Sequence, residues 1–67
     1  MALGTAIRMR RKALNMTLQE LARKVNANSG NLSRIERGTQ GISEAMLHKL
    51  CAALDCTAAS LYAQSDA

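Results

Sequence analysis

The sequence has no proline, tryptophan or phenylalanine, and Tyr62 is its only aromatic residue. The hydrophobic residues, which make up 48% of the chain, are therefore almost all aliphatic or sulfur-containing. Such a core suits short packed helices better than a sheet, because strands favour aromatic and β-branched residues. A chain of 67 residues is long enough for one domain. Its core is small, because a domain of this size buries only about 60% of its unfolded surface.

Cysteine and histidine are also scarce, which argues against a metal site or a disulfide framework. Cys51 and Cys56 are too few and too close together for a disulfide-stabilised secreted domain. Together with His48 they supply three ligands where a structural zinc site needs four. The sequence has no glycine-rich phosphate loop and no cluster of carboxylates, so no catalytic group can be assembled. We expect no metal, no cofactor and no enzymatic activity.

Long apolar runs are missing as well. No stretch approaches the roughly 18 apolar residues of a membrane-spanning helix, and no signal peptide is recognisable. We therefore expect a cytoplasmic protein with no membrane partner. The sequence leaves open whether the chain is a full protein or a fragment of a longer regulator.

Positive charge is concentrated in the first half of the chain. Residues 1–38 contain eight basic and two acidic side chains, a net charge of +6, whereas residues 39–67 contain one basic and three acidic side chains, a net charge of −2. A basic half beside a mildly acidic half is typical of a protein that meets a polyanion on one side. The alternative is a solvated surface, and charge alone does not decide between the two.

Capping residues and glycines divide the chain into five expected helices. The best defined begins at Thr17, because Thr17 and Glu20 have the spacing of a capping box. Its apolar residues form one stripe at helical spacing: Leu18, Leu21, Ala22 and Val25. The other helices are expected over Thr5–Leu14, over Ser29–Arg37 before Gly38, from the cap Ser43 to about Leu54, and from the cap Thr57 to about Tyr62. In the first helix Ile7 and Leu14 are expected to face the core. Residues 64–67 are expected to be frayed.

The stretch Leu18–Arg37, LQELARKVNANSGNLSRIER, places two of these helices around a short turn. Ala22 supplies the small residue that such a close crossing requires, and Asn26 tolerates the left-handed conformation of a tight turn. Leu21, Val25, Ala27, Leu32 and Ile35 can attach both helices to one core. The second helix then projects with its other face free.

These residues strongly resemble the helix-turn-helix family of the phage repressor and Cro proteins, also called the XRE-like family. The resemblance covers about Ile7–Tyr62, and its most specific segments are TLQELARKV, LSRIERG and LHKLCAALDC. The chain departs from the family at Asn26, Leu18 and Ile42, where relatives often have Gly, Gln and Pro. The resemblance implies an all-α fold, a compact bundle of about five short helices like the lambda-repressor DNA-binding domain. Residues 1–67 would form one domain, with the helix-turn-helix motif at about 18–37.

In this family the third helix lies in the major groove with its N-terminal residues toward base edges. With Leu32 and Ile35 inward, the candidates for base contacts here are Ser29, Gly30, Asn31, Ser33 and Arg34. Arg34 is the best base reader, because a guanidinium matches a guanine edge bidentately. The alternative for Arg34 is a phosphate contact or a solvated charge. Gly30 either permits close approach of the backbone to DNA or is merely tolerated near a helix start.

Phosphate contacts are expected from helix N-termini and from the loop after the third helix. The candidates are Thr17, Leu18, Asn28, Arg37, Thr39 and Arg8, with Arg10 as an alternative to Arg8. At Leu18 only the main-chain N–H is available for such a contact. The family resemblance also pairs Arg11 with Glu36 in a structural ion pair between the first helix and the end of the third.

Relatives bind palindromic operators as two-fold dimers, because one recognition helix gives little selectivity. The expected partners are therefore double-stranded DNA and a second copy of the chain. The candidates for the dimer contact are Ala58, Leu61 and Tyr62, although Leu61 and Tyr62 could instead seal the core. The expected function is a sequence-specific transcriptional regulator, a repressor of phage, prophage, controller or antitoxin type. The alternative is a protein-interaction module of the same fold, which would need an apolar outer face on the third helix.

Overall fold

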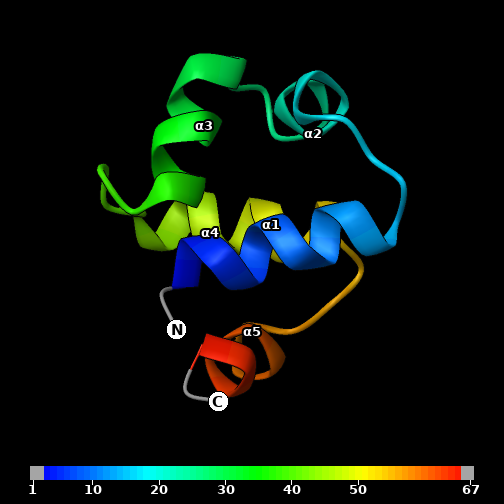
Figure 1. The fold of residues 1–67 in the computed structure, drawn as a ribbon, viewed down its shortest axis with the longest axis vertical. Coiled ribbons are helices and arrows are strands. Elements are labelled where there is room, and N and C mark those ends of the chain that lie inside the picture. Colours follow the sequence, from blue (N-terminus) through cyan, green and yellow to red (C-terminus); the bar gives the residue numbers. More distant parts are fainter. Residues whose placement is uncertain (1–2, 66–67) are drawn as a thin grey trace.

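A computed structural model describes residues 3–65, and this part of the chain folds into five α-helices with no strand (Figure 1). The helices are α1 (Leu3–Ala13), α2 (Leu18–Lys24), α3 (Ser29–Arg37), α4 (Glu44–Ala53) and α5 (Ala58–Ser65). The expected all-α fold is thus confirmed. No helix in the described range is both long and apolar enough to cross a bilayer.

Side-chain caps fix where the helices begin. Thr17 Oγ1 accepts the Glu20 N–H at 3.1 Å while Glu20 Oε1 accepts the Thr17 N–H at 3.0 Å, which completes the capping box. Asn28 and Ser43 accept N–H groups in the first turns of α3 and α4. Asn26, with φ of 56°, adopts the left-handed conformation expected of the α2–α3 turn. These local contacts set the direction of α3 relative to α2.

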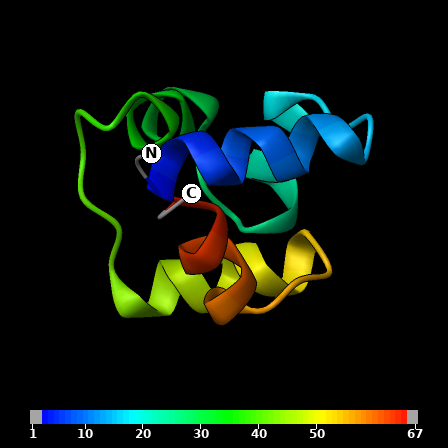
Figure 2. The same cartoon turned by 60° about the horizontal axis from the view of Figure 1, so that its bottom comes forward.

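The helices are arranged with α2 and α3 at one end of the molecule, α5 at the other, and α1 and α4 between them (Figure 1). Figure 2 shows the α3–α4 loop running along one edge. The buried apolar residues of the core are Ala6, Ile7, Leu21, Ala22, Val25, Leu32, Ile35, Leu50, Leu54 and Leu61. Leu18, expected on one stripe with Leu21, is half-buried and packs against this core. The outward face of α3 is therefore held by a continuous apolar layer beneath it.

Two expectations about helix ends were wrong. Leu14 is 39% exposed rather than inward, because α1 ends at Ala13 and the chain reverses through Asn15, which has a positive φ of 55°. The Met16 N–H closes this turn by donating to the carbonyl of Arg11 at 3.1 Å. At the other end Gln64 and Ser65 belong to α5 instead of a frayed tail. The remainder of that expectation, residues 66–67, lies outside the described residues.

The start and the last turn of α1 hold the C-terminal end of α3 in place. A Cβ added at Gly4 would lie 2.1 Å from the carbonyl oxygen of Ile35, so the two helices touch through backbone there. Farther along α1, Arg11 Nε donates to Glu36 Oε2 at 2.7 Å and Arg11 Nη2 donates to Glu36 Oε1 at 3.0 Å. Arg11 Nη1 also donates to the carbonyl of Met16 at 2.9 Å. The ion pair expected from the family resemblance is present and largely buried. The hydrogen bond to Glu36 raises the pKa of Arg11.

Candidate nucleic-acid interface

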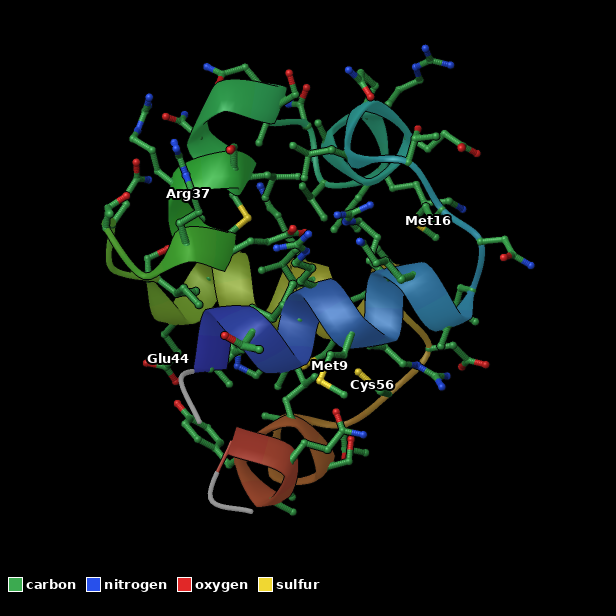
Figure 3. All side chains as sticks on the ribbon, in the orientation of Figure 1. Met9, Met16, Arg37, Glu44 and Cys56 are labelled. Carbon is green, nitrogen blue, oxygen red and sulfur yellow. The ribbon has the colours of Figure 1, made fainter. Side chains whose placement is uncertain are left out.

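The outward face of α3 carries the residues expected to meet DNA. Leu32 and Ile35 face the core, whereas Gly30, Arg34 and Arg37 are exposed. The remaining candidates for base contacts, Ser29, Asn31 and Ser33, are half-buried along the same helix. Figure 3 shows the polar side chains that surround the ends of α2 and α3 at the top of the molecule. The structure thus leaves a polar and basic helix face open to solvent.

The guanidinium of Arg34 is held by two amide oxygens. Arg34 Nε donates to Gln40 Oε1 at 3.0 Å, and Arg34 Nη2 donates to Asn31 Oδ1. The side chain lies close to the first turn of α3, because a Cβ built at Gly30 would be 3.9 Å from Arg34 Nη1. The same Cβ would be 3.3 Å from Asn28 Oδ1, so a small residue at position 30 leaves room for both groups. Gln40 was not among the residues singled out from the sequence.

The candidates for phosphate contacts form two groups. Some have exposed side chains, and the side chains of the others are used in helix caps or pack against the core. Arg37 and Thr39 are exposed at the end of α3, where Arg37 Nε donates to the carbonyl of Ser33 at 3.4 Å and Thr39 Oγ1 donates to that of Arg34 at 3.2 Å. Arg8 is exposed on α1. The hydroxyl oxygen of Thr17 accepts within its capping box, and Asn28 Oδ1 accepts the Asn31 N–H at 2.7 Å. The half-buried side chain of Leu18 packs against the core.

Arg10 does not belong with these phosphate candidates, although it was an alternative to Arg8. Its Nε donates to the carbonyl of Leu54 at 2.9 Å, and its Nη2 donates to that of Asp55 at 3.1 Å. A cation at a helix C-terminus satisfies carbonyls that have no partner within the helix. Arg10 therefore joins α1 to the end of α4, and the basic cluster of α1 is divided between structural and solvent-facing roles.

The candidates for the dimer contact also differ in their exposure. Leu61 is 1% exposed and belongs to the core of its own chain, so it cannot contact a second copy while the fold is intact. Ala58 is half-buried, and Tyr62 is 49% exposed. Met9, which the sequence analysis did not single out, is 51% exposed. Figure 3 draws its side chain between α1 and α5. Two large exposed hydrophobic side chains thus come from the helices α1 and α5, which pack against each other.

Cysteine and histidine form no metal centre among residues 3–65, where no group of three potential ligands comes together. Cys51 and Cys56 are free thiols, and both are half-buried. Burial, together with the neighbouring Cys56, raises the pKa of the Cys51 thiol. His48 lies 4.0 Å from Glu44 on the exposed side of α4.

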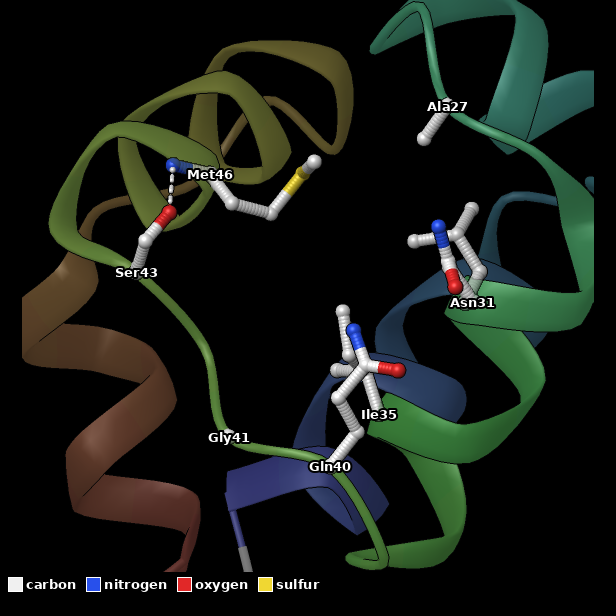
Figure 4. Close-up of a pocket in the computed structure, with 8 residues that line it drawn as sticks. Ala27, Asn31, Ile35, Gln40, Gly41, Ser43 and Met46 are labelled. Carbon is white, nitrogen blue, oxygen red and sulfur yellow. Dashed lines mark hydrogen bonds between the residues drawn. The ribbon is translucent and has the colours of Figure 1, made fainter.

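A small hollow of about 170 Å³ lies between α3, the α3–α4 loop and α4 (Figure 4). Leu32, Ile35 and Met46 line its apolar part, while Asn31 and Gln40 line its polar part. The two amides that hold Arg34 are therefore on the wall of one hollow.

Comparison with known proteins places the chain among regulators of this fold. The family model described as a helix-turn-helix domain matches residues 2–62. The competence pilus inhibition repressor of Acinetobacter baylyi (strain ATCC 33305 / BD413 / ADP1) is 36% identical over 62 residues, which are 92% of this chain and 56% of that protein. The chain thus spans little more than half the length of that relative.

Solved structures agree with this assignment. The clp gene regulator ClgR from Corynebacterium glutamicum has a TM-score of 0.93 at 34% identity, with 96% of this chain and 68% of that chain covered. SinR, the master regulator for biofilm formation, in complex with DNA, has a TM-score of 0.85 at 35% identity, covering 91% and 98%. The restriction-modification controller protein C.Esp1396I shares the fold at 22% identity, with a TM-score of 0.82 and coverage of 92% and 82%. The chain belongs to the helix-turn-helix domain family, in its XRE-like group of DNA-binding regulators.

Proposed function

We propose that this chain is a sequence-specific, double-stranded DNA-binding transcriptional regulator of the repressor type. The single observation that supports this most is the exposed polar face of α3, which carries Arg34 and Arg37 above a buried apolar layer. Support also comes from the relative named a repressor and from the SinR structure, which was solved with DNA. A protein-interaction module would need an apolar face on α3, and the exposed residues of this face are polar or basic. We place the protein in the cytoplasm and assign it no enzymatic activity.

Within this proposal Arg34 donates to the O6 and N7 atoms of a guanine in the major groove. The neighbouring residues on the same face contact other base edges: Ser29, Gly30, Asn31 and Ser33. Phosphates are bound along both sides of the groove by Arg37, Thr39, Arg8, Asn28, Thr17 and Leu18. Asn28 and Leu18 act through main-chain N–H groups, because their side chains are used in a cap or in the core. Thr17 acts through its hydroxyl proton, because its main-chain N–H already donates to Glu20 Oε1.

A comparison of two arginine variants tests this proposal. Arg34→Ala is expected to cost about 1–3 kcal/mol on the preferred duplex and to relax the choice at one base pair. Arg37→Ala is expected to weaken binding to all sequences alike and to reduce the salt dependence of the affinity. Lys49→Ala, which removes an exposed positive charge on α4, is the matched control and should change little.

The measurement is binding to a library of duplexes with randomised sequence, followed by titrations at several salt concentrations. A uniform loss of affinity in Arg34→Ala would make Arg34 a phosphate contact. If the unmodified chain selected no sequence at all, the proposed function itself would be wrong.

We further propose that the chain binds a palindromic operator as a homodimer. The contact is formed by Tyr62 and Ala58 on α5 and by Met9 on α1, the helix that packs against α5. Tyrosine and methionine are both enriched at interfaces between proteins, because they offer large apolar contacts. Helix α5 lies at the other end of the molecule from the start of α3, so a contact through α5 leaves the start of the recognition helix uncovered (Figure 1).

A further inference from the structure

The α3–α4 loop returns alongside α3 and brings a polar side chain to the proposed base reader. Gly38, with φ of 79°, reverses the chain, and the Thr39 N–H donates to the carbonyl of Arg34 at 3.0 Å. The next residue, Gln40, then accepts the Nε–H of Arg34 through its amide oxygen at 3.0 Å. Gln40 lies outside the helix-turn-helix motif, and it reaches Arg34 only because the loop folds back.

The two amide contacts leave Arg34 able to bind a base. A guanidinium has five N–H donors, and here Gln40 and Asn31 use one donor on Nε and one on Nη2. Three donors on the terminal nitrogens remain, which is enough for the two hydrogen bonds that guanine accepts in the major groove. A side chain that is already oriented loses less conformational entropy when it binds, so its orientation favours affinity for the matching base.

Gln40 reaches Arg34 from a part of the loop that has hollows on both sides. The hollow of about 170 Å³ in Figure 4 has Gln40 and Gly41 on its wall, and so does a second hollow of about 240 Å³ toward α1. At these two positions the loop therefore has open space on both sides, and it packs against the core at Ile42. The hydrogen bond from Arg34 Nε to Gln40 Oε1 links the loop to the guanidinium itself, whereas Thr39 donates to the main-chain carbonyl of Arg34.

We propose that Gln40 is a positioning residue that determines the base preference of this protein by orienting the guanidinium of Arg34. The inference rests on the proposed DNA-binding function. It extends the specificity determinants from α3 to the α3–α4 loop. A positioning residue and a phosphate contact differ in their effects. A positioning residue changes the preference at one base pair, whereas a phosphate contact changes the affinity for all sequences alike.

The test measures base preference with the randomised duplex library. Gln40→Met keeps a side chain of similar length without the amide oxygen, and it should lower the preference for guanine at the Arg34 base pair about 2- to 10-fold. Gln40→Glu retains an oxygen that accepts from Nε and should keep the preference, even though its charge weakens binding overall. Gln64→Ala, an exposed glutamine on α5, is the control and should behave like the unmodified chain.

The double variant with Arg34→Ala distinguishes positioning from direct contact. If Gln40 acts through Arg34, adding Gln40→Met to Arg34→Ala causes no further change in base preference. Additive effects, a change at a different base pair, or a uniform loss of affinity would each overturn the proposal. Equal thermal unfolding of the Gln40 variants and the unmodified chain ensures that folding does not account for the result. If the Gln40→Met variant kept the sequence preference of the unmodified chain, this inference alone would be refuted. If the unmodified chain showed no sequence preference, the proposed function would be refuted.

Discussion

Among single residues, Gly4 allows α1 to approach the backbone of α3 closely. A Cβ there would lie 2.1 Å from the carbonyl oxygen of Ile35 and 2.9 Å from that of Glu36, and backbone atoms cannot move aside as a flexible side chain can. Gly4→Ala should therefore lower the free energy of unfolding by about 1–3 kcal/mol or more. Gly41→Ala is the control, because nothing lies within 4 Å of its added Cβ and its φ is not positive. Urea unfolding of both variants decides the question, and equal stabilities would contradict the close contact.

The ion pair between Arg11 and Glu36 is the second residue-scale determinant of stability. The side chains are only 11% and 6% exposed, so Glu36→Ala leaves a positive charge that is largely removed from water. Breaking such a pair costs about 3–5 kcal/mol when burial is deep. Glu44→Ala removes the exposed partner of His48 and should cost at most about 1 kcal/mol.

Replacing both partners tests whether the unpaired charge causes the loss of stability in Glu36→Ala. Because two apolar side chains of similar volume leave no charge unpaired, Arg11→Met combined with Glu36→Leu should recover much of the stability lost in Glu36→Ala. The free energies of unfolding of the three variants are compared in urea at one pH. A double variant that is less stable than Glu36→Ala would show that the cost comes from packing rather than from the unpaired charge.

At the scale of helices, the capping box of α2 connects stability to pH. The hydrogen bonds from the backbone and the side chain of Thr17 lower the pKa of Glu20. The ionised carboxylate therefore favours the folded state. This contribution is present above the unfolded pKa of a glutamate and is lost as the pH falls through the lower, folded pKa. Glu20→Gln keeps an oxygen for the Thr17 N–H but removes the charge.

The melting temperature of Glu20→Gln should thus be below that of the unmodified chain at neutral pH. The difference should vanish in acid, once Glu20 is protonated in both states. Thermal unfolding followed by circular dichroism at a series of pH values measures it. A difference that is independent of pH would show that the charge of Glu20 contributes nothing through its cap.

The helices were predictable from the sequence where their determinants are local. The caps Thr17, Asn28 and Ser43 each act on a residue three positions later, and such spacing is visible in the sequence. Leu14 was misplaced because the end of α1 depends on the left-handed turn at Asn15, which helical periodicity does not reveal.

The candidate site, too, was predictable where its determinants are local. The outward position of Arg34 follows from helical geometry, because Leu32 and Ile35 fix which face is buried. Its contact with Gln40 depends on the path of the α3–α4 loop, which the sequence pattern did not specify. Arg10 reaches carbonyls 44 and 45 residues away, so its structural role needed the packing of α1 against the end of α4. Sequence analysis thus missed contacts that depend on the path of a loop or on how two helices pack, whereas the Arg11–Glu36 pair, 25 residues apart, was expected only from the family resemblance.

At the scale of the whole molecule, the dimensions fit a pair of domains on DNA. The principal extents are 28 × 23 × 20 Å, and recognition helices of a two-fold dimer enter major grooves about 34 Å apart. Because each copy is smaller than this spacing, one copy reaches one half-site, and two copies are needed to reach both. The contact proposed through α5 lies away from the start of α3, so pairing leaves the start of the recognition helix uncovered.

The last prediction tests this assembly. The chain should form a weak dimer in solution that tightens on a palindromic duplex, because two domains on one duplex raise the effective concentration of each for the other. Tyr62→Glu should weaken pairing, since it places a charge in an apolar contact, and should lower the affinity for a palindrome more than for a single half-site. Leu14→Glu changes another exposed hydrophobic residue, at the turn after α1, and serves as the control. Sedimentation with and without the duplex measures the stoichiometry. Saturation at one domain per palindromic duplex would exclude the dimer, and equal behaviour of the two variants would move the contact away from α5.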